Sequence, residues 1–219
     1  MLWLMTAVLL ADPQPNATLE AQPSAVQTGT LLVSRGDCLA IRAVSQSPYT
    51  HVGTVVMRHG EPLVYDSMNG IGVRCLTLPA YLDRQKPARL DIYRPTREFT
   101  EDETDAFEKY LDSQLGRTYN VRQHVTGEDV AGIHCAEYVT EALVAADLVS
   151  VKDSARVSPG SLVDGLTEGK LYQHALALDL HDPRPATNAK QGWCRWAWTS
   201  TKNCTVECCS QVQRWFCCK

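Results

Sequence analysis

The stretch "GIHCAEYVTEAL" at residues 132–143 places Cys135 where a helix is expected to begin. A thiol attacks a carbonyl group as the thiolate, and a free cysteine with a pKa of about 8.5 is mostly protonated at neutral pH. A helix amino terminus lowers that pKa, and its free N–H groups could bind an oxyanion. A cysteine here could equally be a buried core residue, the more common use, or a metal ligand or half of a disulfide. Position alone therefore leaves the role of Cys135 open.

A nucleophilic cysteine needs a base, and His51 is the candidate among the six histidines of the chain. It opens an expected strand, at a sheet end where loops meet. His59 is expected in a solvated turn. His134 adjoins Cys135, but adjacent residues on a helix point apart, which makes it a poor base. Glu137 is expected to face away from the thiol as a solvated helix charge.

The expected hairpin over residues 51–67 brings Asp66 near His51, because opposed residues in a hairpin have numbers that sum to a constant. If the turn centres between His59 and Gly60, Asp66 lies one diagonal step from His51. If it centres one residue earlier, the two are directly opposed. Either arrangement puts both side chains on one face within roughly 4.5–8 Å. Asp66 could then orient the imidazole in a Cys-His-acid triad, or it could simply be a surface residue at a strand end.

These residues need a sheet to hold the hairpin and a helix to present the thiol. Early segments have strand-like hydrophobic patterns, and later segments carry helical stripes. Thr100 and Glu103 form a capping-box pattern at the start of one helix. We expect strands within 31–33, 38–41, 51–67, 71–78 and 88–95, and helices within 100–116, 134–148 and 161–166. The fold class is therefore α+β.

Size and charge narrow the function classes. The chain has 219 residues, 21 of them basic and 25 acidic, for a net charge of −4. This balance does not indicate a basic face, so we do not expect a nucleic-acid partner. We divide the chain into an apolar leader or signal (residues 1–11), a linker (12–28), a hydrolase-type domain (29–182) and a Cys/Trp-rich tail (183–219). The leader has signal-peptide length but lacks a preceding basic residue. A secreted or cell-envelope location and a cytoplasmic one both stay open.

The nine cysteines are unevenly spread, so the body and the tail are interpreted separately. Cys38 and Cys75 lie in expected strands as core residues, with a bridge between them as the alternative. Six more lie within residues 194–219. They could form disulfides, bind zinc, or dock on a membrane together with the tail tryptophans through an acylated Cys217 or Cys218. Peripheral membrane association through the tail is one expected interaction.

Several motifs, taken in order, resemble the YiiX/YaeF-like permuted papain-fold cysteine amidases, which belong with the wider NlpC-type hydrolases. They read "GDCLAI", "SPYTHVGTVV", "VYDSMNGIGV", "GRTYN", "HCAEYVTEAL" and "VSPGSLVDGL". The resemblance covers roughly residues 30–166 and implies a circularly permuted papain-like fold, with an antiparallel sheet packed against helices, one of which starts at the nucleophile. It implies His51 as the base, Asp66 as the orienting acid and Cys135 as the nucleophile.

The chain departs from the family pattern at three positions, one of which is Ala136, where serine is commoner after the family's cysteine. Asp66 stands where the family usually has glutamate, and Asn120 follows the tyrosine where the family has aspartate. The resemblance therefore leaves Tyr119 as a residue that supports the substrate or the oxyanion. It implies hydrolysis of an amide or ester in a peptide- or acyl-type substrate through a thioester, with no metal or cofactor. The alternatives are a lipid-acting thiol acyltransferase or esterase, and a non-catalytic peptide- or lipid-binding module.

Overall fold

The structure is a computed structural model that describes residues 26–35, 47–84, 89–121, 124 and 131–180. These residues form a mixed α/β fold around one six-stranded sheet, in which every neighbouring pair of strands is antiparallel. The strand order is β4-β3-β2-β1-β5-β6. The strands are β1 Leu31–Arg35, β2 Tyr49–Arg58, β3 Glu61–Met68, β4 Gly72–Thr77, β5 Arg89–Pro95 and β6 Tyr172–Asp179.

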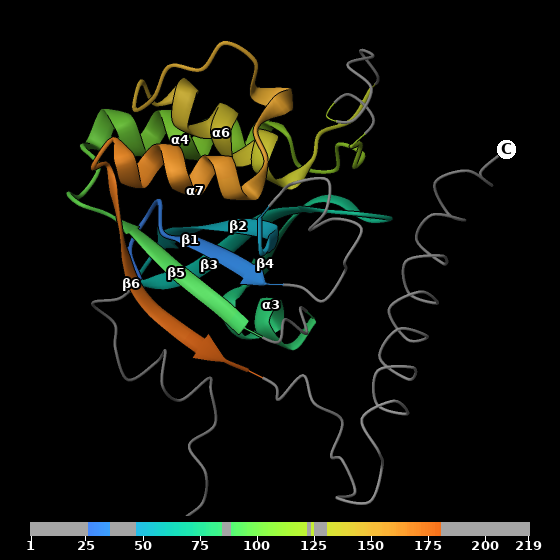
Figure 1. Cartoon of the computed structure of the whole chain (residues 1–219), viewed down its shortest axis with the longest axis horizontal. Helices are drawn as coiled ribbons and strands as arrows, with labels where there is room; N and C mark the ends of the chain where they lie inside the picture. The colour runs from blue at the N-terminus through green and yellow to red at the C-terminus, as the bar shows by residue number, and fades with distance from the viewer. Residues whose placement is uncertain (1–25, 36–46, 85–88, 122–123, 125–130, 181–219) are drawn as a thin grey trace, which may run out of the picture.

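Helices cover both faces of this sheet (Figure 1). Three of them, α4, α6 and α7, lie together on one face, and α3 lies on the other. The helices are α3 Leu78–Arg84, α4 Glu101–Ser113, α6 Cys135–Ala145 and α7 Pro159–Glu168, with a short 3-10 turn, η2, at Ser154–Arg156. Within the described part of the chain, none of these helices is long and apolar enough to cross a membrane.

Each face of the sheet has its own hydrophobic core. The core under α4, α6 and α7 includes Phe107, Tyr138 and Leu143, all fully buried. The core under α3 is smaller and includes Tyr81 and the strand residues Val64 and Ile92. Because α6 has buried side chains along its whole length, it is the central helix of the larger layer.

The observed elements match the expected ones in most places. The capping box at Thr100 and Glu103 is present at the start of α4. The helix expected over 134–148 spans Cys135–Ala145, and the short helix expected over 161–166 begins earlier, at Pro159, with Ser158 as its N-cap.

Three elements, α3, β6 and the short η2, were not expected. Helix α3 begins at the residue after β4 ends, so no turn residue marks the change. Strand β6 buries only two of its eight residues fully, which hides the alternation of a strand. The expected strand over 38–41, the leader over 1–11, most of the linker and the tail over 183–219 lie outside the described residues.

Candidate active site

The β2–β3 hairpin sets the spacing of His51 and Asp66. Its turn residues, His59 and Gly60, have φ angles of 53° and 84°, as a two-residue type I′ turn requires. The register pairs Gly53 with Asp66, so Asp66 lies one diagonal step from His51. Of the two registers considered from the sequence, this is the one in which the turn centres between His59 and Gly60. His51 Nε2 and Asp66 Oδ2 are 3.0 Å apart.

The neighbouring strand holds the other side of the carboxylate. Arg74 on β4 pairs with Asp66 across the ladder and grips it with two donors. Nε donates to Oδ1 at 2.7 Å and Nη2 donates to Oδ2 at 3.1 Å. The Asp66 side chain is fully buried, and burial alone would raise its pKa. Hydrogen bonds from His51 and Arg74 outweigh burial and lower the pKa of Asp66, which keeps the carboxylate ionised.

The thiol of Cys135 is placed by the chain that leads into α6, of which it is the first residue. Ser67 on β3 donates its hydroxyl to the Ile133 carbonyl at 2.7 Å. Ile133 N–H donates to the Thr118 carbonyl at 3.0 Å. Arg117 donates to the Gly132 carbonyl at 2.8 Å. These bonds fix the backbone immediately before the thiol from both the sheet and the segment after α4.

His51 interacts with the thiol of Cys135 as well as with Asp66, and each of the two groups shifts the pKa of the other. Burial opposes ionisation of the thiol, but the charge of His51 and hydrogen bonds to His134 and His51 lower the pKa of Cys135 to about 5. Burial also opposes a charged His51, and interactions with Cys135 and Asp66 raise its pKa to about 10. Since Nε2 faces Asp66, Nδ1 is the ring nitrogen left for the sulfur. The favoured state at neutral pH is a thiolate–imidazolium pair.

His134 differs from its expected place. It is the N-cap of α6 rather than a helical residue, and it lies beside the thiol instead of pointing away. Its Nδ1 accepts from the Glu137 N–H at 3.3 Å, while Nε2 lies 2.9 Å from the Ala155 carbonyl. His134 therefore stabilises the helix start, and its ring also hydrogen-bonds the thiol of Cys135.

Glu137 was wrongly expected to be a solvated charge. Its side chain is buried and closes the capping box by accepting from the His134 backbone N–H at 3.3 Å. Burial raises the pKa of Glu137. The spacing of a cap residue and a glutamate three positions later is a sequence signal that could have revealed this, had histidine been considered as the cap.

Two tyrosine hydroxyls lie near the reacting groups. Burial and the charge of Cys135 raise the pKa of Tyr119, which keeps that hydroxyl protonated beside the thiol. Tyr81 on α3 is fully buried, and burial and the charges of Asp66 and Cys135 raise its pKa. Gly53 makes room for this hydroxyl, because a Cβ at Gly53 would lie 3.2 Å from Tyr81 Oη. The sequence analysis missed Tyr81 and Arg74.

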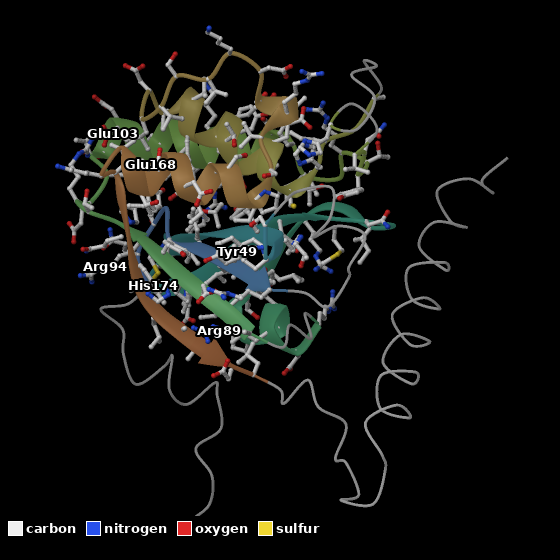
Figure 2. All side chains as sticks on the ribbon, viewed as in Figure 1. Tyr49, Arg89, Arg94, Glu103, Glu168 and His174 are labelled. Atoms are coloured by element: carbon white, nitrogen blue, oxygen red, sulfur yellow. The ribbon has the colours of Figure 1, made fainter. Side chains whose placement is uncertain are left out.

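A second polar cluster surrounds Asp91, which is fully buried on β5. Arg35 on β1 donates to Oδ2, and Arg89 Nε and His174 Nε2 each lie 3.4 Å from Oδ1. Figure 2 labels Arg89 and His174 on this part of the sheet. The cluster joins three neighbouring strands and compensates a buried carboxylate, so we assign it a structural role.

The remaining thiol of the described residues, Cys75, is free and half-buried. Burial raises its pKa, the opposite of the effect at Cys135. Cys38, its expected bridge partner, lies outside the described residues. Within the described ranges, no group of three or more His, Cys, Asp and Glu side chains could hold a metal ion.

Comparison with known proteins finds similarity to solved structures but not to a family model. No family model matches the sequence, and no curated protein matches it. The fold is similar to the crystal structure of the metalloprotein YiiX from Escherichia coli O157:H7, with 19% identity and a TM-score of 0.46. The alignment covers 56% of this chain and 67% of that chain. The proposals below therefore depend on the residues of this chain.

Proposed function

We propose that the protein is a cysteine-nucleophile hydrolase of the amidase or peptidase type. The observation that carries the proposal is the continuous contact from Cys135 to His51 to Asp66, with a thiol pKa lowered to about 5. A buried cysteine that only packs in a core has its pKa raised, as Cys75 does. A depressed thiol pKa produced by a specific charged partner is typical of a nucleophile.

The reaction proceeds by acyl transfer through a thioester. The Cys135 thiolate attacks the substrate carbonyl, and backbone N–H groups at the start of α6 stabilise the oxyanion, with the Tyr119 hydroxyl as a further donor. The His51 imidazolium gives its proton to the leaving amine or alcohol, and neutral His51 then takes a proton from water as that water hydrolyses the thioester. Asp66 holds Nε2 and stabilises the imidazolium.

The same arrangement supports a circularly permuted papain-type fold as part of the proposal. The histidine and the acid come first, on adjacent antiparallel strands, and the cysteine follows at the start of a helix. Peptide amides and acyl esters are the substrate classes that this chemistry serves, because a thiolate attacks both carbonyl types.

The test is the fate of an acyl group delivered by an activated ester such as p-nitrophenyl acetate. We expect an acetyl adduct on Cys135, seen by peptide-resolved mass spectrometry, and steady release of acetate. Cys135→Ala should abolish both. Cys75→Ser is the matched control, because it removes the other thiol of the described residues and should leave both unchanged.

Two outcomes would reject the proposal. Equal acetylation of all accessible cysteines at neutral pH, with none favoured, would leave Cys135 an ordinary thiol. Retention of a peptide or lipid ligand by both the wild-type protein and Cys135→Ala, without turnover by either, would instead favour a binding module.

A further inference from the structure

We propose that Arg74 is a positioning residue for the cysteine chemistry and acts through Asp66. The inference rests on the proposed function, because it concerns how the acid of the triad is held. Arg74 itself touches the carboxylate that touches the base, and three contacts separate it from the sulfur. Neither the motifs nor the resemblance in the sequence singles it out.

The geometry supports a clamp rather than a simple ion pair. Arg74 donates from Nε to Oδ1 and from Nη2 to Oδ2, so both oxygens of Asp66 are held. Oδ2 is also the oxygen that His51 Nε2 meets at 3.0 Å. Two planar groups joined by two parallel bonds cannot rotate independently. The direction in which Asp66 presents Oδ2 to the imidazole is therefore set by Arg74.

The burial of the Arg74–Asp66 ion pair distinguishes it from an ion pair on the surface. The Asp66 side chain is fully buried, and the Arg74 side chain is only 12% exposed. Carboxylates in such places are costly unless they are paired and hydrogen-bonded. Because β3 and β4 pair directly, the register Asp66↔Arg74 delivers the guanidinium without any contribution from a loop.

Charge gives the clamp a second effect. In the favoured state the four groups alternate in sign: Arg74 positive, Asp66 negative, His51 positive and Cys135 negative. Tyr81 also faces this group from α3 and stays neutral. Loss of the arginine charge leaves two buried anions to share one imidazolium. Protonation of the thiolate or of Asp66 then becomes more favourable. Either change reduces the thiolate fraction, because a neutral Asp66 no longer stabilises the imidazolium that pairs with the thiolate.

The test compares Arg74→Gln and Arg74→Lys with the wild-type protein. The rate of Cys135 alkylation by iodoacetamide is followed against pH by peptide-resolved mass spectrometry. For Arg74→Gln we expect the pH midpoint of Cys135 alkylation to rise by about one unit. At a pH below both midpoints, this corresponds to roughly tenfold slower alkylation than in the wild-type protein. For Arg74→Lys we expect partial rescue, because lysine keeps the charge and loses the fork.

Arg97→Gln is the matched control, because Arg97 makes the same two-bond grip on Glu103 at an exposed site. It should keep the wild-type profile. If Arg74→Gln does not fold, as judged by circular dichroism, the Arg74→Lys profile decides alone. In an Asp66→Asn background, Arg74→Lys should add no further loss if Arg74 acts through Asp66.

The outcomes separate this inference from the proposed function. A wild-type midpoint near that of an ordinary cysteine would defeat the proposed function itself. A low wild-type midpoint that Arg74→Gln leaves unchanged would overturn only the role of Arg74. Full rescue by Arg74→Lys would show that charge suffices and would overturn the positioning role.

Discussion

Two histidines adjoin one thiol, and their ring nitrogens decide their different roles. His51 binds a buried carboxylate through Nε2 and leaves Nδ1 for the sulfur. His134 has a carbonyl oxygen on one nitrogen and a backbone N–H on the other. In the proposed mechanism the base takes up and releases a proton, and we assign that role to His51 because His134 also holds the start of α6. Sequence adjacency to Cys135 is therefore a poor guide to the base.

The ionisation of Cys135 should depend on His51. Removing the imidazole in His51→Ala removes the largest interaction that lowers the pKa of Cys135 against burial, so the midpoint for Cys135 alkylation should rise from about 5 toward that of an ordinary cysteine. The wild-type rate should increase as pH rises through about 5, where the thiolate forms. Ester turnover should then fall as pH passes about 10, where His51 loses its proton.

The measurement is alkylation against pH at each cysteine of both proteins. Cys75 is the internal reference, because burial raises its pKa and its alkylation should begin only in alkaline solution in both. A His51→Ala profile that superimposes on the wild-type profile would contradict the ion pair.

The residues of the site were predictable to different degrees. His51 and Asp66 share one hairpin, so arithmetic along the chain confines their separation to two values. To place Arg74, the β3–β4 register must also be known. To place Tyr81, helix α3 must be known, and the sequence pattern did not predict that helix. Contacts within one supersecondary unit can be derived from sequence, whereas contacts that need the register of a further strand or an unexpected helix cannot.

At the scale of elements, β4 and the segment after α4 are joined by backbone contacts. Val73 N–H donates to the Arg117 carbonyl at 2.8 Å, and Gly116 N–H donates to the Val73 carbonyl at 3.0 Å. Gly72 permits this approach, because a Cβ there would lie 2.4 Å from the Arg117 oxygen. The same segment leads on to Thr118, which binds the backbone before Cys135. The glycine therefore contributes to the placement of the thiol.

Gly72→Ala should destabilise the protein more than Gly70→Ala. Both glycines have positive φ, 93° and 76°, but a Cβ at Gly70 meets nothing within 4 Å. We expect the free energy of unfolding to fall by about 1 kcal/mol for Gly70→Ala, from backbone strain, and by about 3 kcal/mol for Gly72→Ala. Urea denaturation measures both. Equal losses would show that the segment yields to the new methyl group without cost.

The elements themselves were predictable where their patterns were long and bounded. The hairpin had two β-type runs separated by a short polar turn, and α4 had a capping box, so both lie close to where they were expected. Helix α3 has seven residues, too few for a periodic stripe. Strand β6 is at the edge of the sheet, where burial contributes little to its pattern.

At the scale of the whole molecule, one sheet lies between two hydrophobic cores. The strand order places the candidate site away from the edge formed by β6. The residues of the proposed triad lie on β2, β3 and α6, while β5 and β6 extend the sheet on the other side of β1. Tyr172 of β6 nonetheless returns to the start of the described chain, where its hydroxyl donates to the Gly29 carbonyl at 3.0 Å. Strand β6 thus connects the two ends of the described chain.

A shortened chain without residues 183–219 tests where the folded body ends. The described residues, which end at 180, already form both cores, so we expect the melting temperature to change by less than about 4 °C and Cys135 to keep its acetylation by an activated ester. Removal of residues 172–219 is the contrasting case. It also takes away β6, with buried Tyr172 and Leu178, and should abolish cooperative unfolding. Loss of Cys135 acetylation on removal of 183–219 alone would mean that the Cys/Trp-rich tail takes part in the chemistry, and the boundary predicted near residue 182 would be wrong.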